Sequence, residues 1–424
     1  MTQQIPSGEA IFIARQPVFH PDSTLWGYEL LFRAAQADKT AMVADGAQAT
    51  ASVIADGLAL ATEGISSGLR ILINFPEKLL IEDVGFALPK DSCVIEILED
   101  VNPSEEALGA ARRLKDAGYI IAVDDFFGQP SLLPFLELAD IVKIDILELE
   151  SDPGRVRQAV DKLPVRNGLQ LLAEKVEDNQ TFEFLRDLGF DLFQGFFFSR
   201  PEVIPGKKLS ASEISKLQLL NELSSENFEP KRLAEILQSD PNLSYRLFRY
   251  INSVGFGLRQ KVQSLKRAID MMGMLQAKQW LRTALMADLN TAPTGGELAF
   301  MSVHRAKFLE SVCSLSSKSY ECVPDTLFIT GLFSLLDAML GVDMKDVLQS
   351  LPLDDAIVRA LRGGSGIHDL LDLAQCYEQG DWDAVTYRLE NLGIDPAEAD
   401  DVYAKTRVWA QHMIASGRDD GAAD

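Results

Sequence analysis

Apolar runs and amphipathic segments alternate along the first half of the chain. Eight runs rich in Val, Ile, Leu and Phe have the length of buried strands, and they lie at 10–19, 25–33, 70–75, 93–98, 119–123, 141–144, 169–173 and 192–198. Segments with helical spacing fill most of the gaps, at 46–61, 104–117, 134–138, 154–163 and 179–188. This alternation predicts parallel β/α units.

The number of units favours a closed α/β barrel of the TIM-like kind. Eight strands in roughly 190 residues match such a barrel, and strands that are apolar on both faces need helices around them. Residues 20–24 alone separate the first two runs, a connection too short for the crossover that joins parallel strands. We therefore expect the first two strands to be antiparallel. An open, doubly wound sheet is the alternative, although no GxGxxG turn follows the first strand.

The pattern changes after residue 200, where the strand-like runs stop. Residues 203–212 carry Pro, Gly and two Lys, which is typical of a linker. Helical periods then follow, one of them unbroken over 326–340, and predict a compact all-α domain. We therefore predict a barrel domain at 9–202, a linker at 203–212, a helical domain at 213–415 and a frayed tail at 416–424.

Composition narrows the possible partners. A chain of 424 residues exceeds the usual size of one hydrophobic core, which agrees with two domains. Asp and Glu number 63 against 40 Lys and Arg, and the net charge of -23 has the wrong sign for a duplex nucleic-acid surface. The sequence has no run of about 18 apolar residues that would predict membrane insertion, no signal peptide and no CxxC pair. These observations predict a cytoplasmic protein.

Oxygen-rich side chains recur at the ends of the predicted strands. Because the carboxyl ends of barrel strands meet at one mouth, these side chains are expected to converge there. Carboxylates crowded in a partly dry cleft repel one another, and hard cations such as Mg2+ or Mn2+ remove that cost through all-oxygen ligation. The pattern predicts a metal-dependent site, whose candidates are Glu29, Asn74, Glu96, Glu99, Asp124, Asp125, Lys143, Glu174, Glu177 and Gln194.

Two adjacent aspartates suit a two-metal centre. Asp124 can bridge two cations about 3.5–4 Å apart while Asp125 holds one of them. Lys143 can orient the attacking water or stabilise phosphoryl charge, and Glu174 can accept the proton of the water. A single acidic residue at a strand end is more often a helix cap or a solvated charge, so the hypothesis of phosphodiester hydrolysis depends on the whole set.

The ordered motifs of this half resemble the EAL domain, the phosphodiesterase domain of bacterial cyclic di-GMP signalling. The resemblance covers about residues 9–202. It rests on Gln16-Pro17, on Glu29, Leu31 and Arg33, on Asn74, on Glu96 and Glu99, on Asp124-Asp125-Phe126, on Lys143-Ile144-Asp145, on Ala173-Glu174 with Val176-Glu177, and on Gln194-Gly195 with Phe198 and Pro201. Leu30 stands where alanine is usual, and Lys175 replaces the usual glycine.

The resemblance implies a hydrolase that opens cyclic di-GMP to linear pGpG with two Mg2+ or Mn2+ ions. Lys143 and Glu174 are expected to position and deprotonate water. Arg33 is expected to meet a phosphate oxygen, and Gln16 and Gln194 to contact substrate or water. Glu99 and Glu177 are expected to brace loops, and the implied metal ligands are Glu29, Asn74, Glu96, Asp124 and Asp125.

The loop after Asp125 departs from the pattern of the family. It reads DDFFGQPSL instead of DDFGTGYSS, so Phe127 takes a glycine position and Pro130 restricts the backbone. The change puts in question the second metal and the loop's contribution to a homodimer. Three functions stay open: an active phosphodiesterase, a receptor that binds cyclic di-GMP without useful turnover, and a protein-interaction scaffold.

The helical half resembles the HDOD domain, a non-catalytic relative of HD-type phosphohydrolases. The resemblance rests on 240–244 (DPNLS), 251–253 (INS), 264–269 (SLKRAI) and Met272-Gly273. Residues 334–337 (SLLD) stand where an active enzyme has its HD pair, and His368-Asp369 reads as the start of a helix. The resemblance implies a module for regulation or for binding a protein partner.

Overall fold

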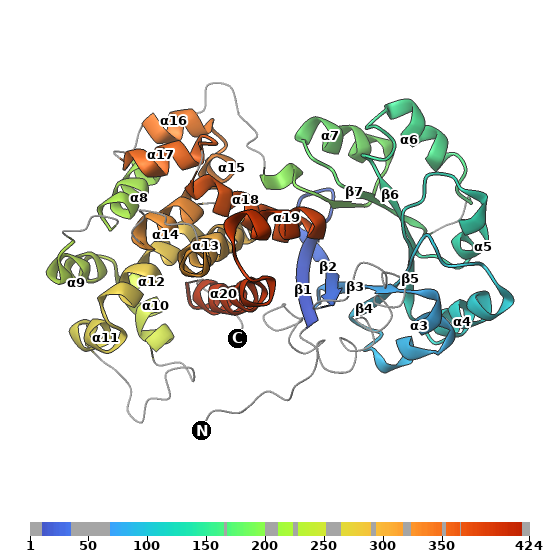
Figure 1. Cartoon of the computed structure of the whole chain (residues 1–424), viewed down its shortest axis with the longest axis horizontal. Helices are drawn as coiled ribbons and strands as arrows, with labels where there is room; N and C mark the ends of the chain where they lie inside the picture. The colour runs from blue at the N-terminus through green and yellow to red at the C-terminus, as the bar shows by residue number, and fades with distance from the viewer. Residues whose placement is uncertain are drawn as a thin grey trace. The chain divides into compact units, whose positions relative to one another are not determined.

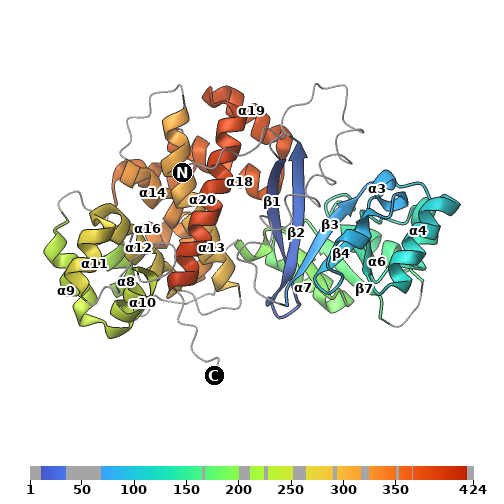
Figure 2. The same ribbon diagram turned by 90° about the horizontal axis from the view of Figure 1, so that it is seen from below.

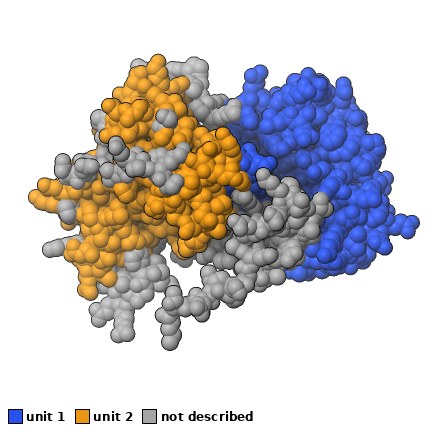
Figure 3. Space-filling model, in the orientation of Figure 1, with its two compact units in different colours: residues 1–200, 376–385 blue, residues 201–375, 386–424 orange. Residues whose placement is uncertain are grey.

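The chain folds into two compact units (Figure 3). One unit comprises residues 1–200 with 376–385, and the other comprises 201–375 with 386–424. The computed structural model describes residues 11–34, 68–164, 168–199, 211–223, 228–251, 264–289, 294–316, 324–349, 353–364 and 366–417. The predicted helix at 46–61 lies outside these residues, as does most of the predicted linker at 203–212.

The first unit is built on a closed barrel of eight strands, in the order β1 to β8. The neighbouring strands from β2 to β8 are parallel, which confirms the barrel and excludes the doubly wound sheet. The strands are β1 (Ile11–Phe19), β2 (Leu25–Ala34), β3 (Arg70–Phe75), β4 (Cys93–Ile97), β5 (Ile120–Val123), β6 (Ile141–Asp145), β7 (Gln170–Glu174) and β8 (Leu192–Gln194).

Strands β1 and β2 form an antiparallel hairpin, as the short connection predicted (Figure 2). A tight turn joins them, in which the His20 N–H donates to the Thr24 carbonyl at 2.8 Å. The Asp22 carboxylate accepts from the Thr24 N–H and hydroxyl at 3.0 and 2.6 Å. Strand β1 also pairs antiparallel with β8, and this pairing closes the barrel.

Short helices connect the parallel strands and lie outside them (Figure 1). Their starts are capped as the sequence leads one to expect: the Ser104 hydroxyl accepts from the Ala107 N–H at 3.1 Å, and Asp178 accepts from Thr181 at 2.8 Å. The first helix was not predicted, because five residues are too few to show a helical period. The helices are α3 (Glu77–Ile81), α4 (Glu105–Asp116), α5 (Leu133–Leu136), α6 (Pro153–Val160) and α7 (Asn179–Leu188).

The last strand is shorter than predicted. The apolar pattern extends it to residue 198, but β8 ends at Gln194 and a short 3-10 helix follows at Phe197–Ser199. Gly195 has a φ of +136°, and a Cβ there would lie 2.3 Å from the Val176 carbonyl oxygen. The chain therefore turns at this glycine, and the phenylalanines that follow pack around Phe19 and Phe182 instead of extending the sheet.

The regular elements in the described residues of the second unit are helices, as predicted. The predicted helix at 326–340 is broken at Ser334, whose hydroxyl donates to the Gly331 carbonyl at 2.7 Å and accepts from Arg305 at 3.1 Å. None of the described helices is long and apolar enough to cross a membrane. The helices are α8 (Ala211–Glu222), α9 (Pro230–Ser239), α10 (Pro241–Ile251), α11 (Leu265–Met272), α12 (Met274–Ala287), α13 (Gly295–Val312), α14 (Pro324–Phe333), α15 (Leu336–Leu340), α16 (Met344–Gln349), α17 (Asp355–Leu361), α18 (Ile367–Gln379), α19 (Trp382–Leu392) and α20 (Pro396–Gly417).

Candidate functional site

The polar ring at the mouth follows from the two-residue period of the strands. A layer of fully buried apolar side chains crosses the barrel: Val18, Leu72, Val94, Ala122, Ile141, Leu172 and Leu192. Alternate side chains of a strand point to the same face, so the residue two positions nearer the mouth lies above each of these. Strand β1 runs in the opposite direction, so the mouth-side position of this strand lies two residues before Val18 in the sequence. The positions are Gln16, Asn74, Glu96, Asp124, Lys143, Glu174 and Gln194.

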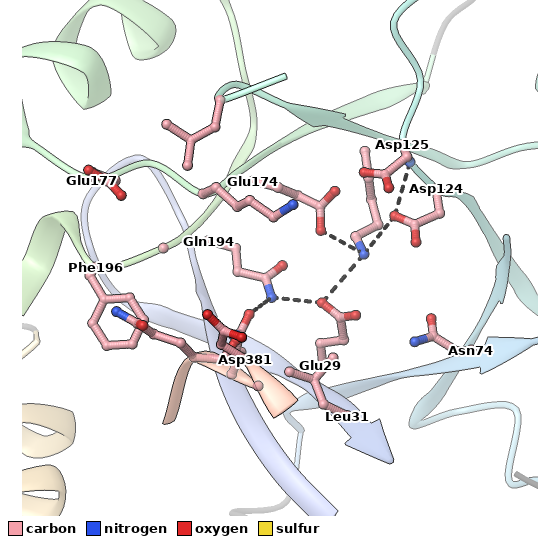
Figure 4. A pocket seen from close by; sticks show the side chains of 17 residues that line it. Glu29, Leu31, Asn74, Asp124, Asp125, Glu174, Glu177, Gln194, Phe196 and Asp381 are labelled. Carbon is pink, nitrogen blue, oxygen red and sulfur yellow. Dashed lines mark hydrogen bonds and ion pairs between the residues drawn. The ribbon is translucent and has the colours of Figure 1, made fainter. Parts of the chain in front are cut away.

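Lys143 lies at the centre of this ring, with its side chain 1% exposed. Its ammonium nitrogen lies 2.8 Å from Glu174, 2.9 Å from Asp124 and 3.4 Å from Glu29. It also forms a short ion pair with Glu96. Figure 4 shows the labelled carboxylates Glu29, Asp124 and Glu174 reaching toward the same ammonium group from different strands. One cation thus partly neutralises four buried acids that the sequence analysis had placed at separate strand ends.

The crowding of acids perturbs their protonation. Burial raises the pKa of Glu96 well above its usual value, and Glu29 adds to the rise while Lys143 opposes it. Burial likewise raises the pKa of Glu174, against the opposing effect of Lys143. Burial alone would lower the pKa of Lys143, but the surrounding carboxylates, led by Asp124, raise it well above its usual value. The ring therefore holds a charged lysine and an excess of acid that one lysine does not neutralise.

A second acidic group lies beside the ring. Carboxylate oxygens of Glu99, Asp124 and Asp125 lie within 4.8 Å of one another, close enough to share a cation. Burial raises the pKa of Asp125 to about 7, and the neighbouring Asp124 and Glu99 add to this shift. Among the described residues, Glu99, Asp124 and Asp125 have the spacing that is needed to bind one metal ion together.

Three buried side-chain oxygens in the ring are available as metal ligands. Asn74 Oδ1, Glu96 Oε2 and Gln194 Oε1 have no hydrogen-bond partner among the described residues. A buried polar atom without a partner is costly unless another group satisfies it. Oxygen donors of this kind are the ligands that Mg2+ and Mn2+ prefer, so the ring fits a divalent cation.

The remaining substrate candidates lie at one side of the mouth. The Gln194 side-chain amide donates to Gln16 Oε1 at 2.6 Å and to Glu29 Oε2 at 2.7 Å. Glu177 lines the same cavity, which has a volume of about 570 Å3. Arg33 lies in β2, but its side chain is outside the described residues. The structure therefore brings every candidate whose side chain it describes to one cavity or its immediate border.

Comparison with known proteins identifies the family. Residues 3–201 match the EAL domain and residues 214–344 match the HDOD domain. The chain is 31% identical to the cyclic di-GMP phosphodiesterase CdgJ of Vibrio cholerae, over 95% of this chain and 93% of that protein. The chain belongs to the EAL family and carries an HDOD domain after the EAL domain.

Further relatives extend the comparison. The chain is 32% identical to the uncharacterized protein YuxH of Bacillus subtilis, over 95% of this chain and 99% of that protein. A crystal structure of an EAL domain protein from Listeria monocytogenes aligns at 24% identity with a TM-score of 0.37, covering 45% of this chain and 87% of that structure. Each of these two relatives aligns over 95% of the chain, so the similarity extends over both of its halves.

The altered loop of this EAL domain is held by a glutamine that the sequence analysis did not single out. Gln129 Oε1 accepts from the Phe127 N–H at 2.8 Å, and Gln129 Nε2 donates to the Asp125 carbonyl at 2.7 Å. Asp125 has a φ of +43°, and Gly128 has a φ of +106°. The side chain of Gln129 therefore ties the loop to Asp125, whose carboxylate stays beside Asp124.

Lys175 is a second departure of this EAL domain from the family pattern. It occupies a left-handed position, with a φ of +53°, where the family has glycine. Its ammonium group forms a short ion pair with the buried Asp145 and lines the cavity next to Glu174. The Asp145 carboxylate in turn accepts from the Leu147 N–H at 2.8 Å, so Lys175 is anchored to the loop after β6.

Proposed function

We propose that this protein hydrolyses cyclic di-GMP to linear pGpG in a reaction that depends on divalent cations. The observation that carries the proposal is the group of four buried carboxylates that share the Lys143 ammonium among the described residues. The full-length similarity to a cyclic di-GMP phosphodiesterase supports the choice of substrate. The excess of acid is what a centre for cations and a phosphodiester requires.

Two cations, Mg2+ or Mn2+, are proposed at the mouth. When bound, they supply charge for the phosphoryl oxygens and lower the pKa of a water molecule. The orphaned oxygens of Asn74 and Glu96 and the close group of Glu99, Asp124 and Asp125 support these positions. The proposed ligands are Glu29, Asn74, Glu96, Asp124 and Asp125.

Lys143 and Glu174 are the proposed catalytic residues. The Lys143 ammonium is fixed by its ion pairs, so it can stabilise developing phosphoryl charge without reorganising. Glu174 lies beside it at 2.8 Å and has a raised pKa, which brings its basicity closer to that needed to accept a proton from water near neutral pH. Glu174 is therefore the proposed base.

The mouth also offers groups for the rest of the nucleotide. Gln16 and Gln194 present amide groups to the cavity, and Phe196 offers an aromatic surface to a guanine base (Figure 4). Arg33 is proposed to contact a phosphate oxygen. Glu99 and Glu177 are proposed to brace the surrounding loops, and Glu99 lies against Asp124 and Asp125 in agreement with that role.

A receptor without turnover is the less favoured function. It rested on the altered loop, which put the second metal site in question. Asp125 lines the cavity together with Asp124, and Gln129 donates to the Asp125 carbonyl, which supports an intact loop. The roles of the HDOD domain in regulation or partner binding and of a homodimer stay predictions.

The test is an assay of the purified full-length protein with cyclic di-GMP and Mn2+, followed by chromatography of the linear product. Glu29→Ala is expected to reduce kcat at least about a hundredfold, because it removes a buried charge from the reacting centre. Glu105→Ala is the matched control, because Glu105 is exposed on α4 and does not line the cavity. Tight binding of cyclic di-GMP without any product in the unchanged protein would overturn the proposed activity and favour a receptor.

A further inference from the structure

A turn from far along the chain belongs to the barrel unit. Residues 376–385 cluster with residues 1–200. Within them, Gln379, Gly380 and Asp381 line the cavity that holds Lys143 and Glu174. Figure 4 labels Asp381 at this cavity. We call residues 379–381 the mouth turn. Neither the EAL match nor the HDOD match includes it, since these end at residues 201 and 344.

The mouth turn binds a side chain proposed to contact the nucleotide. Gln16 Nε2 donates to the Gln379 carbonyl at 2.7 Å. Gln16 Oε1 accepts from Gln194, and the same Gln194 amide nitrogen donates to Glu29. An amide donates through nitrogen and accepts through oxygen, so the carbonyl of Gln379 sets the orientation of Gln16. The Gln16 amide nitrogen carries two N–H donors, and it also lies 3.5 Å from the Glu378 carbonyl oxygen. A ligand that needs a Gln16 donor therefore competes with the carbonyls of Glu378 and Gln379.

The fit of the turn depends on Gly380. Its φ is +66°, and a Cβ at this position would lie 2.4 Å from Leu31 Cδ1. Leu31 belongs to β2, two residues beyond Glu29. The close approach seats the turn directly against the strand that carries this proposed metal ligand, and a larger side chain at position 380 forces the turn or Leu31 to move.

The turn also adds negative charge to the mouth. The Asp381 carboxylate lines the cavity while it accepts from the Ala384 N–H at 3.0 Å (Figure 4). The cavity already contains Asp125, Glu174 and Glu177. Like charges repel, so Asp381 opposes the entry of a ligand that carries two phosphodiester anions.

We infer that the mouth turn is an intramolecular inhibitor, which competes with the cyclic dinucleotide for the Gln16 amide and must leave before the nucleotide binds. This inference rests on the proposed function. The turn joins α18, which ends at Gln379, to α19, which begins at Trp382. A signal that moves either helix therefore moves the turn and changes access to the cavity. If the turn has left the cavity in only a small fraction of the molecules, the apparent Kd for the cyclic dinucleotide equals the intrinsic Kd divided by that fraction.

The experiment compares Gly380→Leu with Gly366→Leu in the full-length protein. Gly366 also has a positive φ, of +95°, but nothing lies within 4 Å of a Cβ placed there, so this control carries the backbone penalty without the clash. Hydrogen exchange of the 376–385 peptide reports whether the turn is seated. The Kd and KM for cyclic di-GMP with Mn2+ report access to the cavity.

Gly380→Leu is expected to increase exchange of this peptide and to lower Kd and KM about tenfold, with kcat within about twofold of the unchanged protein. Gly366→Leu is expected to leave exchange, Kd and KM unchanged. Asp381→Asn keeps a side chain that can cap the helix and removes one charge, and is expected to lower KM about threefold. This variant tests the inference even if Gly380→Leu folds poorly.

Two results overturn the inference in different ways. If exchange increases in Gly380→Leu while KM is unchanged or higher, the turn is no inhibitor, although the proposed function stands. If neither the unchanged protein nor any variant binds or hydrolyses cyclic di-GMP, the proposed function itself fails and the inhibitor role fails with it.

Discussion

Replacing Lys143 with methionine removes a buried cation from the acidic ring. Its ammonium lies 2.8 Å from Glu174, 2.9 Å from Asp124 and 3.4 Å from Glu29. Breaking a buried ion pair by removing one partner costs about 3–5 kcal/mol, because the other partner stays buried without compensation. The thermal midpoint of a unit of this size changes by about 2–4 °C per kcal/mol, so we expect Lys143→Met to lower Tm by about 10 °C at pH 7.5 without metal.

The loss is expected to depend on pH and on metal. Glu96 and Glu174 have raised pKa values, so the folded protein binds more protons than the unfolded chain, and stability falls as the pH rises above the unfolded values. Without Lys143 the stability is expected to fall more steeply as the pH rises, because no ammonium group offsets the ionised carboxylates. The difference in Tm between the variant and the unchanged protein is therefore expected to be smaller at pH 5.5 than at pH 7.5. Mn2+ is expected to raise the Tm of the variant by more than it raises the Tm of the unchanged protein, because the cation supplies the charge that the variant lacks.

Scanning calorimetry at both pH values, with and without Mn2+, measures these differences. Lys115→Met is the matched control, because Lys115 pairs with Asp140 where both side chains are about one-third exposed, and such pairs contribute at most about 1 kcal/mol. If Lys143→Met has the same Tm as Lys115→Met at pH 7.5 without metal, the ring is not held by its central lysine and the electrostatic reasoning is wrong.

Three further predictions concern the proposed second cation. Because the pKa of Asp125 is about 7, a proton competes below that pH, and calorimetry should find Mn2+ binding about tenfold weaker at pH 6 than at pH 8; equal affinities would contradict this. Gln129→Ala should cost about 1–2 kcal/mol of unfolding free energy and raise the Mn2+ concentration for half-maximal turnover, since it removes both bonds that hold the loop; an unchanged Mn2+ dependence would exclude that role. Lys175→Gly should lower this Mn2+ concentration about threefold by removing a positive charge near Asp125, and a higher value would show that Lys175 supports the site.

The strands and the ring could be predicted because both depend on local periodicity. Alternation along a strand fixes which residues share a face, so an apolar layer and an acidic layer two residues further on can be recognised without tertiary information. The antiparallel hairpin was predicted for a similar reason, since residues 20–24 are too few for any other connection. The break of the helix at Ser334 was missed, because it depends on Arg305, which is distant in sequence.

The contents of the mouth could be predicted only in part. The sequence indicates acids at strand ends, but the convergence of four of them on Lys143 depends on closure of the barrel, which brings strands β2, β4, β5 and β7 to one point. Gln129 is near Asp125 in the sequence, yet its bonds depend on the turn that the loop takes. Residue type alone does not reveal such a turn, because several backbone paths fit the same sequence.

The sequence by itself determined the barrel, the helical half and the acidic character of one end, because each depends on residue type at a regular local spacing. Only the tertiary structure decided which groups meet in that end. The bond between Gln16 and the Gln379 carbonyl joins residues 363 positions apart, and no local pattern encodes a contact at that separation. It forms because folding brings residues 376–385 to the barrel unit, where Gly380 leaves room for Leu31.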